Sequence, residues 1–311
     1  MLKTAIERLP RADWQARAAR HAAQVDGFVD PHIARRLAGE KHPVHDFLFT
    51  YYSQRPAQLR RWHSGFGVAL VDAEDYAGLR GYAALVEEVP RQPSRNPTYA
   101  VSAEYVARQA PLLASTERLL SATASRPAHL GCFGLHEWAM VHRLTEDGTR
   151  HPDWPLRLGP SGTDQVVESH RIACSHFDAF RFFTPTARPL NTMDPGSDNR
   201  AAYEQPGCLH ANMDLYKHAY RLTPMVHSEL VADCFELARE IRVMDMRASP
   251  YDLAGLGLDP IAIETPVGKR AYAAAQRGFA DRAEPLRQWL VDECCRLLVA
   301  GRTQDAQELD H

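Results

Sequence analysis

Residues 228–247 read Ser-Glu-Leu-Val-Ala-Asp-Cys-Phe-Glu-Leu-Ala-Arg-Glu-Ile-Arg-Val-Met-Asp-Met-Arg, and this stretch decides the fold class. Within it Leu230, Cys234, Leu237 and Ile241 recur at the three- and four-residue spacing that places apolar side chains on one face of a helix. Ser228 is a residue type that favours a helix start. The stretch therefore predicts a long helix with one buried face.

The same spacing recurs elsewhere in the chain. Residues 286–297 repeat it, and Gly301 is expected to end that helix. Ser102 is expected to open another helix that runs through Tyr105 and Val106. A further helix is expected from Asp72 and Asp75, with an apolar face of Tyr76, Leu79, Ala83 and Val86.

Alternating runs typical of strands are few, so the predicted fold is all-α or strongly α-dominated. We expect a single helical domain with a helix-bundle core and long connections rich in Pro and Gly. Its predicted parts are a basic N-terminal helical segment (1–40), a helical catalytic domain (41–300) and a C-terminal tail (301–311).

Composition indicates a soluble globular protein, since 45% of the 311 residues are hydrophobic and 24% are charged. No apolar run approaches the roughly 20 residues of a membrane-spanning helix, and residues 1–20 lack the apolar centre of a signal peptide. A cytoplasmic location without membrane attachment is expected. The six cysteines are expected to be reduced.

The net charge of −3 argues against a protein whose main task is to bind phosphate backbones. Residues 1–61 nevertheless carry eleven Lys and Arg against six Asp and Glu, a local charge of +5. We interpret this stretch as a solvated basic face rather than a nucleic-acid surface.

The histidines are clustered, because eight of the fifteen lie between His129 and His218. The same segments contain Glu and Asp among apolar neighbours. Imidazole and acidic groups on apolar helix faces need a hydrogen-bond partner, a counter-charge or a metal, because an unpaired buried charge is costly. This clustering is the strongest functional signal in the sequence.

His45 belongs to the first such segment, residues 41–52. Pro43 suits the first turn of a helix, which would place His45 over Leu48, Phe49 and Tyr52. His45 is therefore expected to face inward, either as a core histidine bonded to a backbone carbonyl or as a ligand or proton carrier.

Glu137 lies in the second segment, residues 131–144, on the same helical face as Met140, Val141 and Leu144. A carboxylate in that setting needs a metal, an Arg from elsewhere or a proton of its own. The segment is not a zinc-protease His-Glu-x-x-His motif, because His142 is six residues after His136. A functional Glu137 and a structural ion pair both remain open.

The third segment, residues 163–183, is expected to begin a helix at Thr163. On a helix His170 and Cys174 are four residues apart, a pair that could chelate a metal or bind beside a haem. Glu168 and His176 would share another face. If the stretch is extended instead, His176 and Asp178 resemble half of an iron facial triad, with His210 as a third ligand.

His210, Asp214 and His218 follow one another at four-residue intervals in the fourth segment, residues 207–220. On a helix they form a stripe that can present two neighbouring ligands, His210 and Asp214, to one ion. Lys217 and Arg221 lie beside Asp214, so a salt-bridged surface explains the pattern equally well.

Residues 42–49, 131–140, 174–183 and 207–216 together resemble a group of actinobacterial proteins identified as 3-methyladenine DNA glycosylases, over about residues 40–290. The resemblance implies hydrolysis of the N-glycosidic bond of an alkylated base flipped out of the duplex. The Leu-Pro-Gly-Val-Gly-like hairpin of the helix-hairpin-helix glycosylases is not found in this sequence.

We favour the hypothesis of an iron-dependent oxidoreductase, an oxygenase with haem or non-haem iron, acting on a small aromatic or amino-acid-like molecule. Two other hypotheses are a DNA glycosylase, with Glu137 or Asp214 activating water, and a metal or haem carrier without catalysis. No Glu-x-x-His pair occurs in these segments, so a ferritin-like di-iron site is not predicted. The candidate residues are catalytic His45, Glu168 and His176, cofactor-binding His170 and Cys174, and metal-binding Glu137, His170, His210 and Asp214.

Overall fold

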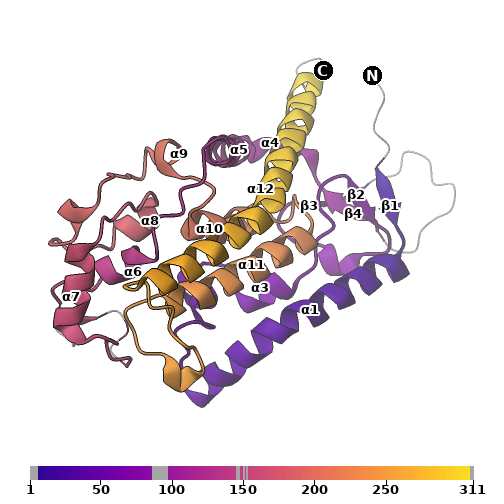
Figure 1. The fold of residues 1–311 in the computed structure, drawn as a ribbon. Coiled ribbons are helices and arrows are strands. Elements are labelled where there is room, and N and C mark those ends of the chain that lie inside the picture. Colours follow the sequence, from indigo (N-terminus) through magenta and orange to yellow (C-terminus); the bar gives the residue numbers. More distant parts are fainter. Residues whose placement is uncertain (1–5, 86–96, 145–147, 150, 152, 309–311) are drawn as a thin grey trace.

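Helices dominate the computed structural model, which describes residues 6–85, 97–144, 148, 149, 151 and 153–308 (Figure 1). Among the described residues helix accounts for 58% and strand for 6%, with twelve helices and one small sheet. The predicted α-dominated fold is confirmed.

Helix α12 (Pro266–Glu308) runs the length of the molecule and packs against α4 (Ala103–Arg108), α5 (Ala110–Ala124), α10 (Leu209–Arg221) and α11 (Ser228–Arg247) (Figure 1). Its buried residues include Leu290, Cys294 and Leu297. The expected end at Gly301 is wrong. A Cβ at Gly301 would lie 3.2 Å from Cα of Ala107, so glycine permits α4 to approach closely and the helix continues.

Helices α10 and α11 form the centre of the main core. The predicted helix from Ser228 is confirmed, and its apolar stripe of Leu230, Cys234, Leu237 and Ile241 is almost completely buried. The helix starting at Ser102 is also confirmed, because the Ser102 side chain accepts a hydrogen bond from the backbone N–H of Tyr105.

Helix α1 (Arg11–Ala38) packs along α11 and α3 (Pro56–Arg60) and ends at Gly39, whose φ of +71° suits a residue without a side chain (Figure 1). The sheet beside its start has the order β1-β2-β4-β3. Strand β1 pairs in parallel with β2, and the other pairs are antiparallel. The strands are β1 (Glu7–Leu9), β2 (Val68–Leu70), β3 (Tyr82–Ala84) and β4 (Tyr99–Val101).

The helix expected from Asp72 is wrong. A short turn, η1 (Glu74–Tyr76), is followed by strand β3, and Val86 lies outside the described residues. Asp72, Gly78 and Gly81 have φ values of +52°, +70° and +86°, which a right-handed helix does not contain. Residues with positive φ, two of them glycines, therefore interrupt the helix that the apolar spacing predicts.

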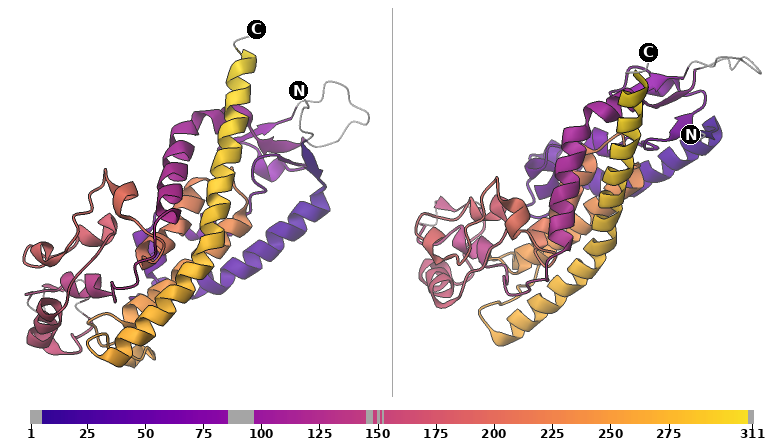
Figure 2. Two further views of the ribbon diagram at one scale, coloured as in Figure 1. Left: turned by 45° about the horizontal axis from the view of Figure 1, so that its top comes forward. Right: turned by 90° about the horizontal axis from the view of Figure 1, so that it is seen from above.

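The described loops and short helices between α5 and α10 gather at the end of the molecule opposite the sheet (Figure 2). All six cysteines are free thiols. Among the described residues, every helix is too short or too polar to cross a membrane. The remaining elements are α2 (Phe47–Tyr51), α6 (Leu135–Ala139), α7 (Gly159–Ser169), α8 (Phe177–Phe180), η3 (Arg188–Leu190), α9 (Arg200–Tyr203) and η4 (Ala254–Leu256).

Candidate metal centre

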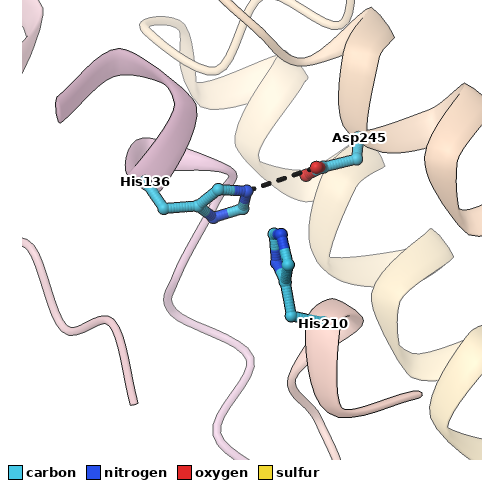
Figure 3. Close-up of side chains that lie close together, drawn as sticks. All are labelled: His136, His210 and Asp245. Carbon is cyan, nitrogen blue, oxygen red and sulfur yellow. Dashed lines mark hydrogen bonds and ion pairs between the residues drawn. The ribbon is translucent and has the colours of Figure 1, made fainter. Parts of the chain in front are cut away.

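His136, His210 and Asp245 meet at the junction of three helices (Figure 3). Each offers one ligand atom, and these atoms lie within 4.8 Å of one another. In the described part of the chain no other group of three His, Cys, Asp or Glu residues meets that distance. We call this set the triad.

Local sequence explains how each triad residue is placed. Gly134, with φ of +70°, allows the chain to turn sharply into α6, whose five residues are all buried. His136 is thus held inside the protein rather than on its surface. His210 lies in the first turn of α10, and Asp245 lies four residues after Ile241 on the buried side of α11.

The triad residues point toward one common position. Nε2 of His136 is 3.2 Å from Oδ2 of Asp245, and the rings of His136 and His210 are nearly perpendicular, with centroids 4.5 Å apart. Oδ1 of Asp245 is buried and has no hydrogen-bond partner. A buried carboxylate oxygen without a partner is costly, so the site has unused capacity for a ligand or cation.

The three side chains of the triad differ in protonation state. Burial and then the neighbouring His136 lower the pKa of His210 to about 3, so this imidazole is neutral with a free lone pair. Burial alone would lower the pKa of His136, but the Asp245 carboxylate outweighs it and raises that pKa well above its usual value. Burial would raise the pKa of Asp245, but protonated His136 lowers it to about 2. In this state an imidazolium–carboxylate pair occupies the position of a metal–carboxylate pair.

Arg242 connects the triad to Glu137. Nη1 of Arg242 is 2.8 Å from Oε1 of Glu137 and 3.7 Å from Oδ2 of Asp245. Although burial opposes it, Arg242 lowers the pKa of Glu137. The sequence left three partners open for Glu137: a metal, an arginine or a proton. In the structure the partner is Arg242, and Glu137 does not join the triad.

A cleft leads from the surface to His210. It has a volume of about 270 Å³, and its walls include Tyr51, Phe182, His210 and Arg242. It shares Phe47, Thr50 and His151 with a cavity of about 560 Å³, so the two adjoin each other. One side of the triad is therefore accessible to a small molecule.

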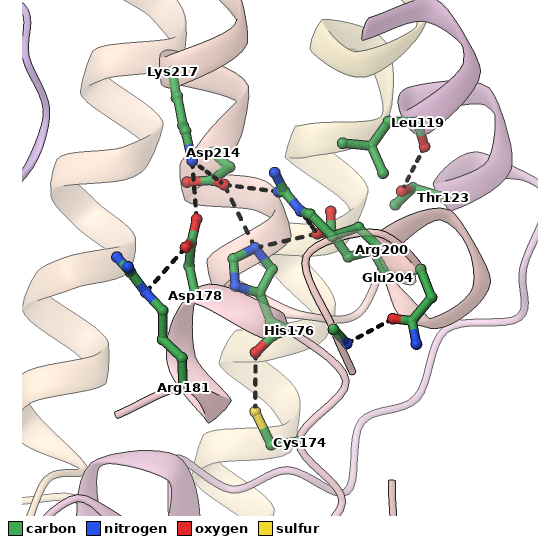
Figure 4. A network of polar contacts seen from close by, with 12 residues as sticks. Leu119, Thr123, Cys174, His176, Asp178, Arg181, Arg200, Glu204, Asp214 and Lys217 are labelled. Atoms are coloured by element: carbon green, nitrogen blue, oxygen red, sulfur yellow. Dashed lines mark hydrogen bonds and ion pairs between the residues drawn. The ribbon is translucent and has the colours of Figure 1, made fainter. Parts of the chain in front are cut away.

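Asp214, predicted to bind metal with His210, belongs instead to a buried network of ion pairs (Figure 4). It accepts hydrogen bonds from Tyr52 (3.0 Å), Arg200 (3.1 Å) and Lys217 (3.4 Å). The helical stripe of residues 210–218 is confirmed, but it is buried rather than a solvated face. Because cations already surround Asp214, it does not coordinate with His210.

His176 lies between this network and the triad. Its Nε2 is 3.6 Å from Glu204 and 3.5 Å from Asp214, and its ring centroid is 5.5 Å from that of His210. The chain is extended at His176, while Asp178 lies within the short helix α8 and pairs with Lys217. The extended interpretation thus describes His176 better than the helical one, but neither His176 nor Asp178 joins the triad.

His170 and Cys174 do not form the expected helical pair. Helix α7 ends at Ser169 and Thr163 lies inside it, so residues 170–176 are not helical and the predicted start at Thr163 is wrong. The His170 ring bonds the backbone carbonyl of Val166, whereas the Cys174 thiol is buried and faces the carbonyl of His176. Neither residue joins the triad.

Glu168 and His45 also lie apart from the triad. Glu168 is exposed and pairs with Arg143 at 2.7 Å and His142 at 3.4 Å. The predicted helix start at Pro43 is wrong, because α2 begins at Phe47 and His45 precedes it in a turn. His45 is half-buried and stacks on His42 with ring centroids 4.3 Å apart.

Two triad residues were not selected from the sequence. His136 does not complete a zinc-protease motif, and Asp245 lies outside the four histidine-rich segments. A signal for Asp245 was present, because the apolar stripe of residues 230–241 reaches it at the next four-residue step. A carboxylate that continues an apolar helix face needs a partner, as Glu137 does.

Comparison with protein-family models, with curated proteins and with solved structures finds no match to this chain. The functional argument therefore depends on the chemistry of the site.

Proposed function

We propose that the protein is a mononuclear non-haem iron oxidoreductase, an oxygenase, in which His136, His210 and Asp245 bind the metal. The donor set carries this proposal: two imidazoles and one carboxylate within 4.8 Å of one another. This combination, with coordination positions left open, is typical of non-haem Fe(II) oxygenases. Iron held in this way would supply the ability to activate dioxygen.

The surroundings of the triad support an enzyme more than a metal store. The cleft reaches His210 from one side, so a substrate has access to the metal without dismantling the core. Its aromatic walls at Phe47, Tyr51 and Phe182 suit a planar or apolar group, and the charged side chains of Asp178 and Arg242, each already in an ion pair, also line it. A small aromatic or amino-acid-like substrate matches this lining.

Haem is the less suitable form of iron. The cavity beside Cys174 and His176 has a volume of about 10 Å³, which is the room of about one water molecule. A porphyrin does not fit there, and the His170 imidazole is already bonded to a backbone carbonyl.

Metal analysis tests the proposal directly. Protein produced with iron available should contain about one iron per triad, show no Soret band, and consume dioxygen with an aromatic or amino-acid-like substrate and a reductant. His210→Ala and Asp245→Asn should each weaken iron binding more than about tenfold, since even outer-sphere changes cost 10–100-fold. His218→Ala, a buried histidine on the same helix, is the matched control and should retain iron. A triad that binds zinc but not iron would refute the oxygenase.

A further inference from the structure

A second cavity adjoins the triad and is lined by two of its residues, His136 and His210. It is lined by three cysteines, Cys132, Cys174 and Cys208, and by three histidines, His136, His176 and His210. Each cysteine precedes its histidine by two or four residues, so three separate segments each contribute one thiol and one imidazole. Cys234, Cys294 and Cys295 lie elsewhere.

Several polar atoms around this cavity lack partners. Nδ1 of His176, the hydroxyl of Tyr272 and Oε1 of Gln276 are buried without a hydrogen bond, and all three residues line the cavity. His176 and Tyr272 are at most 1% exposed. Buried polar groups normally have partners, so a cluster of unpartnered ones around one small space indicates a missing occupant.

We propose that this cavity binds a second metal ion, a soft or borderline divalent ion such as zinc, through the thiolates of Cys132, Cys174 and Cys208 with His176 as a fourth ligand. Three thiolates and one imidazole form a familiar tetrahedral zinc set. The cavity volume of about 10 Å³ suits an ion better than an organic molecule or a cluster. The second site is independent of which metal the triad binds.

The thiols must move to form this site. Among the described residues the triad alone brings three such ligand atoms within 4.8 Å of one another, so at least one sulfur must rotate inward about its Cα–Cβ bond. Cys132 already lies 3.6 Å from Nδ1 of His136. A metal-bound Cys132 would therefore touch the back of a triad ligand and fix the orientation of that ring.

Cobalt(II) is the probe for this site, because thiolate ligands give it a charge-transfer band in the near ultraviolet. Anaerobic titration of the full chain should produce this band and bind about two ions per chain, one at each set of ligands. Cys208→Ser and Cys132→Ser should each reduce the band at least tenfold and the stoichiometry to about one. Cys234→Ser, a buried cysteine outside the cavity, should change neither.

The triad and the cysteine-lined cavity can be tested separately, because each has a variant that should remove metal from that site alone. Asp245→Asn should remove metal from the triad while keeping the thiolate band, whereas Cys132→Ser should do the reverse. Because Cys208 is buried and its variant can fail to fold, half-buried Cys132 gives the safer substitution, with circular dichroism as the folding check. Absence of the band in the wild type, or its persistence in both cavity variants, would overturn the second site and leave the iron proposal intact.

Discussion

Nε2 of His136 and Oδ2 of Asp245 face each other at 3.2 Å in an interior where both side chains are almost completely buried. The pair is an imidazolium and a carboxylate, because the pKa of His136 is raised and that of Asp245 is lowered to about 2. A metal ion binding between them must first displace the proton on His136. Without metal the positive charge of His136 balances the negative charge of Asp245. A metal ion that binds here therefore replaces the proton on His136.

Metal affinity should therefore rise with pH. The pKa of His210 is about 3 and that of Asp245 about 2, so neither releases a proton above pH 5. His136 does release one, because its raised pKa keeps it protonated until the pH passes that value. The dissociation constant should fall by up to about tenfold per pH unit below the raised pKa and level off above it. Calorimetric titration in buffers of different ionisation enthalpy measures the released proton, and a pH-independent affinity would contradict this account.

Removal of the metal should destabilise the fold. A ligand present at a hundred times its dissociation constant stabilises the native state by about 2.7 kcal/mol. For a chain of 311 residues that corresponds to a decrease of roughly 4 °C in the melting temperature after chelation, at an unfolding entropy of about 2.1 cal/mol/K per residue. Differential scanning calorimetry with and without a chelator provides the measurement. Asp245→Asn protein should show no such decrease, and an unchanged melting temperature in the wild type would exclude a tightly bound metal.

Replacing Arg242 should lower the free energy of unfolding more than it lowers the metal content. It is buried, and removing it leaves the carboxylate of Glu137 without its partner at 2.8 Å. Breaking a buried ion pair from one side costs about 3–5 kcal/mol, so Arg242→Met should lower the free energy of unfolding by that order. The double variant Glu137→Gln with Arg242→Met should recover part of the loss. Urea unfolding of both single variants and the double variant gives the coupling energy, and simple additivity would mean that the pair is not coupled.

The sequence predicted the helical fold and singled out two of the three segments that supply the triad, those of His136 and His210, but not the ligand set. Periodicity placed α10 and α11 correctly because both helices bury a regular apolar stripe. It could not reveal that α7 ends at Ser169, since the residues that follow are bent by contacts from distant parts of the chain, such as Asn191 with Cys174.

Long-range partners also decided which polar residues were free to bind metal. Asp214 and Asp245 are both acidic residues on buried helix faces. Asp214 meets Arg200 and Lys217 in the folded protein, whereas one oxygen of Asp245 meets nothing. Spacing along one helix contains no information about these partners, because Arg200 and Asp214 belong to different helices.

Binding to duplex DNA separates the iron proposal from the glycosylase that the resemblance implies. Arg60 belongs to the basic N-terminal stretch, but it is bound to Asp26 and Asp30 of α1, so much of its charge is already neutralised. Arg35 is likewise paired with Asp46. Arginines engaged in this way contribute less to phosphate binding.

We therefore expect little duplex binding at physiological salt and no release of alkylated base. If Arg60 and Arg61 did contact phosphates, replacing both with Gln would reduce the slope of log K against log salt by about 1.8. Fluorescence anisotropy with an oligonucleotide containing 3-methyladenine, measured over a range of salt concentrations, provides this slope. Arg296→Gln, at an arginine paired with Glu293 on α12, is the matched control for a change of surface charge. Tight binding that weakens steeply with salt, together with release of the base, would favour the glycosylase over the oxygenase. Weak binding without base release, together with iron bound at the triad, supports the oxygenase.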